Sequence, residues 1–574
     1  MKHNAVQYLY TVEGENLRDN PDAAVWETYP RPQLARDSYV NLNGWWDFTI
    51  TDSDALPSDY PERIRVPFSP ESMLSGVHRV PPEGARLFYR RTFHLPDGFR
   101  RERVLLHFGA ADQIATVWVN GVELTTHTGG YMPFSVDITA VLQSQNTVVV
   151  RVVDMLENHV LPYGKQRRDR GGMWYTPVSG LWQTVWMESV PTDYVRSMKM
   201  DVTTTSATIR VDGVSAGSIV VDTPDGALES SLCNGVVTIT PEHPRLWSPQ
   251  DPYLYTFTVK AGEDTVRSYF ALRTVEVRAV DGIPRICLNG QPIFLHALLD
   301  QGYWSDGLFL PAQPSGFADD IEAARSLGFN TLRKHIKIEP EQFYYACDRA
   351  GMLVWQDMVN NGDYRFLRDT ILPTIGLKKL DDRRLHRDEE TRRAFEEGMV
   401  QTVEHLYNHP CIVGWTVFNE GWGQFESTRM VGRLRELDGS RVIDGASGWF
   451  SGGDSDVISP HVYFKPVRFA PSDKPTFLSE FGGYVYKVAA HSFNADKTFG
   501  YRFYTDQQAF EDALIRLYEQ QIIPIVSKGL CGAVYTQLTD VEDETNGLIT
   551  YDRRVVKVDA ANMQKIAVKL QEQL

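Results

Sequence analysis

Hydrophobic and polar residues alternate with a period of two over the first third of the chain. Between about residues 26 and 187, apolar positions such as Val117 and Val119 alternate with other side chains, and turn residues recur about every ten positions. Asn120-Gly121 follows Val119 directly, and this pair supplies the positive φ angles of a type I′ hairpin turn. Since no long helical stripe interrupts the pattern, it predicts a β-sandwich.

Short alternating runs continue from about residue 190 to residue 277. Tyr255, Phe257 and Val259 form one such run, and Gly, Pro and Asp separate it from its neighbours. Fewer than a hundred residues with this pattern are typical of one immunoglobulin-like sandwich. The region carries no residue pattern that suggests chemistry, so we expect it to act as a spacer.

The pattern changes after about residue 279, where short apolar runs alternate with helical stripes. Residues 412–418 form one apolar run, and Phe395, Met399 and Val403 precede it at helical spacing. About eight such units occupy close to 300 residues, which is what a (β/α)8 barrel requires. We therefore predict an N-terminal β-sandwich over residues 1–189, an immunoglobulin-like sandwich over residues 190–277 and a C-terminal (β/α)8 TIM barrel over residues 278–574.

Composition and charge narrow the classes of function. The 574 residues carry a formal net charge of −16, which repels polyphosphate and anionic membranes, so we expect no nucleic-acid or membrane partner. No segment approaches the ~18 consecutive apolar residues of a membrane helix, and the start of the chain lacks the apolar stretch of a signal peptide. The default compartment is therefore the cytoplasm. The five cysteines are scattered without CxxC spacing, which predicts reduced core residues.

Two carboxylates follow predicted barrel strands, and barrel enzymes act at the carboxyl ends of their strands. Residues 412–418 lead into Asn419-Glu420, and residues 476–478 lead to Glu480, which by our count end strands four and seven. Glycoside cleavage needs such a pair: one carboxyl protonates the departing oxygen, and the other attacks the anomeric carbon or activates water. A separation of about 5–5.5 Å favours retention, and about 6.5–9.5 Å favours inversion.

A series of short motifs runs through the whole chain. It comprises YRRTFHLP, VWVNG, HTGGYMPFSVDIT and SGLWQTVW in the first predicted sandwich, LWSPQDPYLY and LRTVEV in the second, and FNEGW and SEFGG in the barrel. Each string is weak alone, but together and in this order they resemble glycoside hydrolase family 2, the group of β-galactosidases, β-glucuronidases and β-mannosidases. The resemblance implies the same order of sandwich, sandwich and barrel.

The resemblance also implies roles for single residues. Glu420 resembles the acid/base of the family, and Glu480 resembles the nucleophile that forms a covalent glycosyl-enzyme. Asn419 resembles the residue that hydrogen-bonds the sugar 2-hydroxyl. Tyr463, after predicted strand six, resembles the tyrosine that orients the nucleophile. Arg333, after strand two, resembles an arginine beneath the nucleophile, where its charge would keep the carboxylate ionised.

Other residues near strand ends are weaker candidates, either as sugar contacts or as buried hydrogen-bonding groups. They are His335, Asp357, His461, Asp300, Trp304, Trp449, Gln537 and Lys487. Lys487 would bind the carboxylate of a uronic acid, as would Lys465 and Arg468, although a lysine at a rim is more often simply solvated. The rival carboxylates Asp540, Glu542 and Asp543 rank below the glutamate pair because their strand-end placement is less definite.

The identity of the sugar stays open. Family β-glucuronidases carry an Asn-x-Lys pair after the last strand, and the matching stretch after Thr545 has no lysine at that spacing. Family β-galactosidases place an aspartate of the first domain where this chain has Trp174. We expect a retaining exo-β-glycosidase, β-galactosidase-like, that acts on oligosaccharides or glycosides. A uronic-acid-specific β-glycosidase and a non-catalytic carbohydrate-binding protein are the alternatives.

We expect no cofactor and no essential metal ion. The stretch MVNNGDY has no clear match to the ligands that form the magnesium site of large β-galactosidases. No phosphate loop or dinucleotide fingerprint supports an unrelated chemistry on the same fold. The carbohydrate substrate is the expected partner, and a homo-oligomer stays open because oligomers are frequent in the family.

Overall fold

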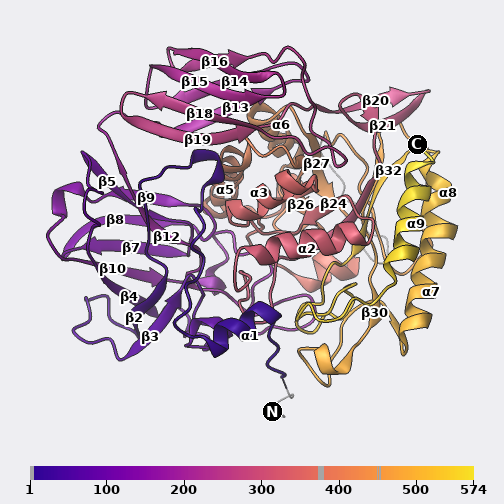
Figure 1. Ribbon diagram of the computed structural model, residues 1–574. Coiled ribbons are helices and arrows are strands. Elements are labelled where there is room, and N and C mark those ends of the chain that lie inside the picture. The colour runs from indigo at the N-terminus through magenta and orange to yellow at the C-terminus, as the bar shows by residue number, and fades with distance from the viewer. Residues whose placement is uncertain (1–5, 373–380, 449, 451–453) are drawn as a thin grey trace.

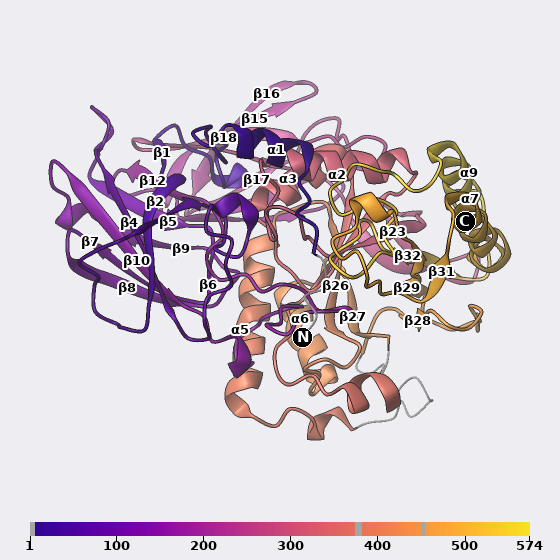
Figure 2. The ribbon, with the colours of Figure 1, turned by 90° about the horizontal axis from the view of Figure 1, so that it is seen from below.

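The computed structural model describes residues 6–372, 381–448, 450 and 454–574 of the chain. Figure 1 shows the first sandwich in indigo and purple on the left, a second sheet in magenta above it, and the barrel on the right. Viewed from below, the first sandwich lies beside the barrel (Figure 2). The predicted order of sandwich, sandwich and barrel is confirmed. Trp449 lies outside the described residues.

Two antiparallel sheets form the first sandwich, because one face of each strand is apolar. Val148, Val150 and Val152 are fully buried between them. Asn120 and Gly121 take φ angles of 52° and 82° and close a two-residue hairpin, as predicted. The six-stranded sheet has the order β3 (Glu62–Val66), β2 (Gly44–Thr51), β4 (Arg86–Phe93), β10 (Asn146–Val153), β7 (Ile114–Val119), β8 (Val122–Thr128), the four-stranded sheet has the order β1 (Tyr39–Asn41), β12 (Val185–Val190), β5 (Arg103–Phe108), β9 (Phe134–Asp137), and β6 (Ala111–Asp112) pairs with β11 (Gly180–Leu181).

The second part is an antiparallel sheet of seven strands around its own apolar core. Ile219, Tyr255 and Val259 are fully buried in it. Cys233 is exposed, so the prediction that all five cysteines lie in cores is wrong for this one. The strand order is β13 (Ser197–Val202), β14 (Ala207–Asp212), β17 (Val236–Ile239), β16 (Gly226–Cys233), β15 (Ala216–Thr223), β18 (Tyr255–Ala261), β19 (Asp264–Phe270), and a separate three-stranded sheet of β20 (Val275–Val280), β21 (Ile283–Leu288) and β22 (Gln291–Pro292) precedes the barrel.

Eight parallel strands form a nearly closed barrel. Strand six is short, because Ile458 makes only an isolated bridge with Thr476 and the strand itself is His461–Val462. The apolar runs predicted at residues 412–418 and 476–478 lie in the strands Ile412–Asn419 and Thr476–Gly482. The order around the barrel is β27 (Val442–Ser447), β26 (Ile412–Asn419), β25 (Leu353–Asp357), β24 (Thr331–Lys334), β23 (Leu295–Asp300), β32 (Leu530–Thr536), β29 (Thr476–Gly482), β28 (His461–Val462).

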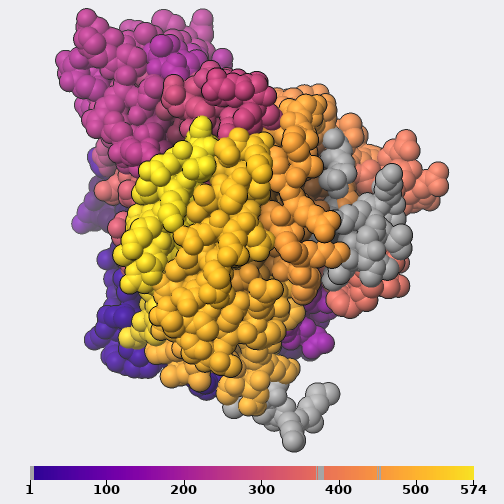
Figure 3. Space-filling model, turned by 90° about the vertical axis from the view of Figure 1, so that its right-hand side faces the viewer, coloured from indigo at the N-terminus to yellow at the C-terminus, as the bar shows by residue number. Residues whose placement is uncertain are grey.

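Helices cover the outside of the barrel with the apolar stripes that the sequence predicts. Phe395, Met399 and Val403 of α5 are buried, for example, and α7 and α9 cover the face shown in Figure 3. The pattern did not predict the helix Ser427–Leu437, although its apolar residues follow helical spacing. The helices are α1 (Val12–Asp19), α2 (Ser315–Ser326), α3 (Glu341–Ala350), α5 (Glu389–Leu406), α6 (Ser427–Leu437), α7 (Gln507–Leu517), α8 (Ile523–Val526) and α9 (Ala560–Gln571), and a short parallel pair, β30 (Tyr484–Tyr486) and β31 (Arg502–Tyr504), lies before α7.

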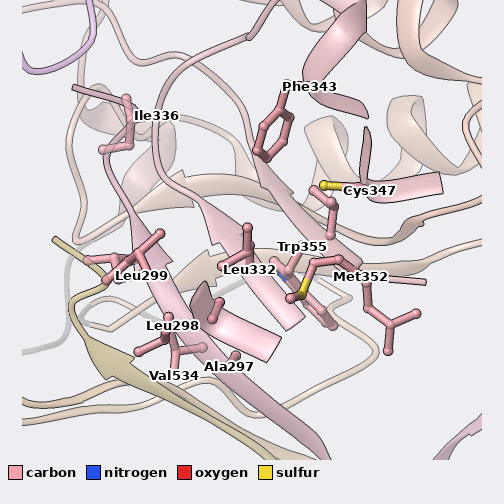
Figure 4. Packing of buried hydrophobic residues seen from close by; sticks show 14 of the residues in the cluster. Ala297, Leu298, Leu299, Leu332, Ile336, Phe343, Cys347, Met352, Trp355 and Val534 are labelled. Atoms are coloured by element: carbon pink, nitrogen blue, oxygen red, sulfur yellow. The ribbon is translucent and has the colours of Figure 1, made fainter. Parts of the chain in front are cut away.

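Close packing between strands and helices fixes the strand ends. Figure 4 shows Leu298 of β23 and Leu332 of β24 in one cluster with Phe343 and Cys347 of α3, and all four are buried. Because such interiors are packed as densely as organic crystals, the polar residues at the strand ends are held in place. In the described part of the chain, no helix is long and apolar enough to cross a membrane.

Candidate active site

The two predicted catalytic glutamates meet at the mouth of the barrel. Glu420 directly follows β26 in a left-handed backbone conformation (φ 51°), which is rare for a non-glycine residue and often marks a functional site. Glu480 lies on β29 opposite His461 of β28. His461 Nδ1 lies 2.8 Å from Glu420 Oε1 and 3.4 Å from Glu480 Oε2. Carboxylate oxygens of the two glutamates come within 4.8 Å of each other.

Arg333 connects the groups below the carboxylate pair. It is fully buried and donates to Glu480 Oε1 at 3.1 Å, to Asp357 Oδ1 at 3.0 Å and to Asn419 Oδ1 at 2.9 Å. Burial alone would raise the pKa of Glu480, but the charges of His461 and Arg333 outweigh it and lower this pKa to about 2. Glu480 is therefore ionised at neutral pH.

Asn419 is oriented with its amide nitrogen free to donate. Its Oδ1 accepts from Arg333 and also from Ser447 Oγ at 2.8 Å. The buried Nδ2 has no hydrogen-bond partner among the described residues. An amide held in this way presents two N–H donors beside Glu480 and Glu420.

Tyr463 contacts the predicted nucleophile directly. Its hydroxyl donates to Glu480 Oε2 and lies 3.1 Å from Thr536 Oγ1. Its ring stacks on Tyr501 with a centroid distance of 3.7 Å. Arg333 and Tyr463 thus hold the two oxygens of Glu480 separately.

His335 and Asp357, which the sequence put forward either as sugar contacts or as buried hydrogen-bonding groups, form a buried pair next to Arg333. His335 Nδ1 lies 2.7 Å from Asp357 Oδ2. Burial lowers the pKa of His335 well below its ordinary value, so the imidazole is neutral. Asp357 accepts from both His335 and Arg333, and this fixes the direction of the guanidinium group.

Asp300 and Trp304 do not join this group. Asp300 accepts from Lys334 Nζ at 2.6 Å, and this ammonium lies over the ring of Phe343, so the ion pair sits between strand and helix. Trp304 packs under the guanidinium group of Arg553, which lies 3.9 Å from its ring centroid. Because side chains point alternately inward and outward along a strand, a position near a strand end does not by itself place a residue at the mouth.

Gln537 and Lys487 also have structural partners. Gln537 Nε2 donates to Asn546 Oδ1 at 2.8 Å and to Glu544 at 3.3 Å. Lys487 Nζ donates to the carbonyl oxygens of Ala495 at 2.7 Å and Lys497 at 3.0 Å. The ammonium of Lys487 is therefore tied to its own loop rather than directed at the carboxylate pair.

The rival carboxylates Asp540, Glu542 and Asp543 also have structural partners. Asp540 pairs with Lys557 at 2.6 Å. Arg170 lies 3.4 Å from Glu542 and 3.5 Å from Asp543. These contacts support the higher rank that the strand-end argument gave to Glu420 and Glu480.

The sequence pattern did not point to Lys165, which belongs to the first sandwich. Its side chain is almost buried (8% exposed), and its ammonium lies 5.6 Å from the ring centroid of Tyr175 and 5.7 Å from that of Trp422. Trp174, which stands where the resemblance would place an aspartate in a β-galactosidase, is buried and stacks on Trp422 at 5.2 Å. The available signal was the basic run KQRRDR in an acidic chain.

Two carboxyl groups whose oxygens come within 4.8 Å at the mouth of a TIM barrel are the arrangement that glycoside cleavage needs. Comparison with known families matches residues 33–191 to the sugar binding domain of glycosyl hydrolases family 2, residues 193–273 to a further family 2 domain, and residues 310–465 to the family 2 TIM barrel domain. The chain belongs to glycoside hydrolase family 2.

The curated relatives described here are named either as a β-galactosidase or as β-glucuronidases. The chain is 26% identical over 448 residues to a β-galactosidase of Thermoanaerobacter pseudethanolicus, which covers 72% of this chain and 56% of that protein. It is 24% identical over 521 residues to a putative β-glucuronidase of Formosa agariphila, covering 80% of this chain and 58% of that protein. The chain thus spans under two thirds of the length of these two relatives. The β-glucuronidase of Sus scrofa is 24% identical over 474 residues, covering 72% of this chain and 69% of that protein.

Solved structures share the fold. A β-glucuronidase of Ruminococcus gnavus superposes with a TM-score of 0.74 at 19% identity, covering 95% of this chain and 99% of that one. A β-D-glucuronidase of Dictyoglomus thermophilum gives a TM-score of 0.72 at 18% identity, covering 94% and 98%. At these identities the likeness establishes the architecture alone.

Proposed function

We propose that this chain is a retaining exo-β-glycosidase. The observation that carries the proposal is the pair Glu420 and Glu480, whose carboxylate oxygens approach within 4.8 Å at the mouth of the barrel. Retaining enzymes have carboxyl groups about 5–5.5 Å apart, whereas inverting enzymes need about 6.5–9.5 Å to hold a water molecule. The short separation supports direct attack by one carboxylate.

The two glutamates divide the reaction into two displacements. In the first, Glu480 forms a bond to the anomeric carbon while the bond to the leaving oxygen breaks, and Glu420 gives its proton to that oxygen. In the second, Glu420 takes a proton from water, the water oxygen bonds to the anomeric carbon, and Glu480 leaves as a carboxylate. Arg333 and Tyr463 support the ionised form of Glu480 that both steps require.

Asn419 and His461 assist this pair. The unpartnered amide nitrogen of Asn419 is available to the sugar 2-hydroxyl, a contact that strengthens in the transition state. His461 Nδ1 lies within hydrogen-bond distance of Glu420 Oε1 and orients the acid/base.

Variants of the two glutamates test the mechanism. We expect Glu480→Gln to abolish hydrolysis of an aryl β-glycoside that the wild type cleaves. We expect Glu420→Ala to slow hydrolysis and to recover with azide, because the small anion attacks the glycosyl-enzyme without base assistance. The product would then be a β-glycosyl azide. Release of the α-anomer as the first product of the wild type, seen by NMR, would show inversion and overturn the proposal.

Among possible sugars, we infer a β-glucuronide as the first candidate and a β-galactoside as the second. Two of the three relatives and both solved structures described above are named as β-glucuronidases, one of them as putative, and one relative is named as a β-galactosidase. A panel of 4-nitrophenyl β-glucuronide, β-galacturonide, β-galactoside and β-glucoside separates these candidates. Oligomeric state stays a prediction.

A further inference from the structure

A segment of the first sandwich is inserted at the mouth of the barrel. It comprises residues 163–166, which we call the insertion segment, in the connection between β10 and β11. Tyr163 N donates to the carbonyl of Asn360 on the barrel at 3.1 Å. At the other end, Gln166 Nε2 donates to Asp112 Oδ2 of the sandwich at 3.0 Å. The segment is thus fixed on both sides.

Gly164 shows how closely this segment fits. Its φ angle is 71°, a conformation that favours glycine. A Cβ atom at this position would lie 3.0 Å from the carbonyl oxygen of Ile336 and 3.0 Å from the hydroxyl of Tyr131. The backbone that carries Lys165 therefore has little freedom to move.

Lys165 differs from the other buried lysines. Lys334, Lys337 and Lys557 each lie within 2.8 Å of a carboxylate oxygen. For Lys165, the described part of the chain supplies no carboxylate within 4.0 Å and no hydrogen-bond acceptor, only the rings of two aromatic residues. Its charge does act on the buried carboxylate of Glu544, which is not in direct contact with it. A largely buried ammonium without an anion in direct contact is costly, and cation–π contacts compensate for only part of that cost.

The ammonium of Lys165 interacts with residues that adjoin the proposed catalytic groups. Trp422, one of the two rings beneath it, follows Glu420 by two residues. The charge of Lys165 also acts on His335: after burial, it is the largest cause of the lowered pKa of that imidazole. His335 bonds Asp357, which bonds the arginine that holds the nucleophile.

We propose that Lys165 selects acidic sugars by binding the carboxylate of a uronic acid held between Glu420 and Glu480. The inference rests on the proposed function, and it names the substrate class. A carboxylate of the substrate would supply the direct ion pair that Lys165 lacks, and a neutral sugar would not. The site itself is lined by carboxylates in a chain of net charge −16, so an anionic substrate needs a local cation to offset repulsion.

Lys165 would also take the place of a carboxylate-binding lysine that the sequence lacks elsewhere. The stretch around Asn546 lacks the lysine with which family β-glucuronidases recognise the sugar carboxylate. Oδ1 of Asn546 itself accepts a hydrogen bond from Nε2 of Gln537. A cation supplied by the sandwich, instead of the loop after the last barrel strand, would serve the same chemistry.

The test compares sugars that differ only at carbon 6. Wild type and Lys165→Met are assayed with 4-nitrophenyl β-glucuronide against the β-glucoside, and with the β-galacturonide against the β-galactoside. We expect kcat/KM for the uronide to fall about 10- to 100-fold, mainly through KM, because a hydrogen bond between charged groups is lost. The neutral sugar should change little, and Lys165→Arg should restore part of the uronide activity.

Lys487→Met is the matched control, because this lysine lies on the barrel face but is bound to loop carbonyls. It should affect both sugars of a pair alike. Three results would overturn the role of Lys165 while leaving the proposed glycosidase function intact. Lys165→Met could lose equal activity on the uronide and the neutral sugar, or lose activity on neither. The wild type could also cleave only neutral sugars. Thermal unfolding of each variant shows whether a uniform loss reflects misfolding.

A failure of the proposed function has a different signature. In that case the wild type cleaves no member of the panel. Binding of D-glucuronate and D-glucose, measured by calorimetry, then decides the inference without catalysis. Preferential binding of D-glucuronate that disappears in Lys165→Met would support the cation's role, and binding that is absent or unchanged would overturn it.

Discussion

The hydroxyl of Tyr463 offers a sharp test of how the nucleophile is kept ionised. Tyr463→Phe removes the hydrogen bond to Glu480 Oε2 and leaves the contact from Arg333 to Oε1. The phenyl ring that remains keeps the stack on Tyr501. The change therefore isolates one hydrogen bond to the charged form of the carboxylate.

The size of the effect follows from the energy of that bond. Hydrogen bonds to charged groups contribute about 1.5–3 kcal/mol, and one pKa unit corresponds to about 1.4 kcal/mol. Loss of a bond to the ionised form raises a carboxyl pKa. In the wild type the pKa of Glu480 is about 2. In the variant we expect it to be about one to two units higher.

The pH dependence of kcat/KM reports this pKa in the free enzyme. Glu480 is active when ionised, so activity falls as the pH drops through its pKa. The wild type should show no acid limb from Glu480 above about pH 3, whereas the variant should begin to lose activity about one to two units higher. The plateau should also fall about 10- to 100-fold, because the nucleophile is less well oriented.

Tyr484→Phe is a suitable control, since this tyrosine lies in β30 and contacts Arg502 instead of a catalytic carboxylate. Circular dichroism at each pH separates loss of activity from loss of structure. A Tyr463→Phe variant with the acid limb and plateau of the wild type would refute the assigned role of the hydroxyl.

Two further predictions concern metal ions and stability. One ligand atom from each of Glu420, His461 and Glu480 lies within 4.8 Å of the other two, so we expect Zn²⁺ to bind there and to inhibit competitively. We expect EDTA alone to leave activity unchanged. Loss of activity in EDTA that Mg²⁺ restores would contradict the expected metal-free mechanism. Burial raises the pKa of Glu71 to about 7, despite its hydrogen bond from Ser179. The folded state therefore binds more protons than the unfolded state above pH ~4, and stability falls as the pH rises towards 7, by up to about 3 kcal/mol for this group. Glu71→Gln should thus gain in unfolding midpoint relative to the wild type between pH 5 and pH 8, and a constant difference over that range would rule the explanation out.

The sequence predicts that Glu420 and Glu480 meet at one end of the barrel, and the structure places them there. The signal is local, since each follows an apolar run that becomes a barrel strand, although Asp300 ends such a run too. The catalytic roles of the two glutamates stay a prediction. Strand six is harder to place, because only His461 and Val462 pair in it and two residues show no periodicity. Helix α6 was not predicted, although its apolar residues follow helical spacing.

Contacts between distant parts of the chain explain the remaining differences. The strand-end rule does not specify which way a side chain points, so it included Asp300 and Trp304, whose partners lie elsewhere. Lys165 reaches the barrel only through the packing of the sandwich against it, and no local pattern encodes that packing. Trp174 has the sequence environment of a core residue and yet stacks on the tryptophan that follows the acid/base.

The insertion segment, residues 163–166, ties the first sandwich to the barrel. Tyr163 belongs to the same buried cluster as the barrel strands, so the two domains share one core at this contact. If Lys165 binds the sugar as proposed, substrate choice depends on a residue of the sandwich, whereas bond cleavage depends on residues of the barrel strands. A library confined to this loop is a direct route to new specificities.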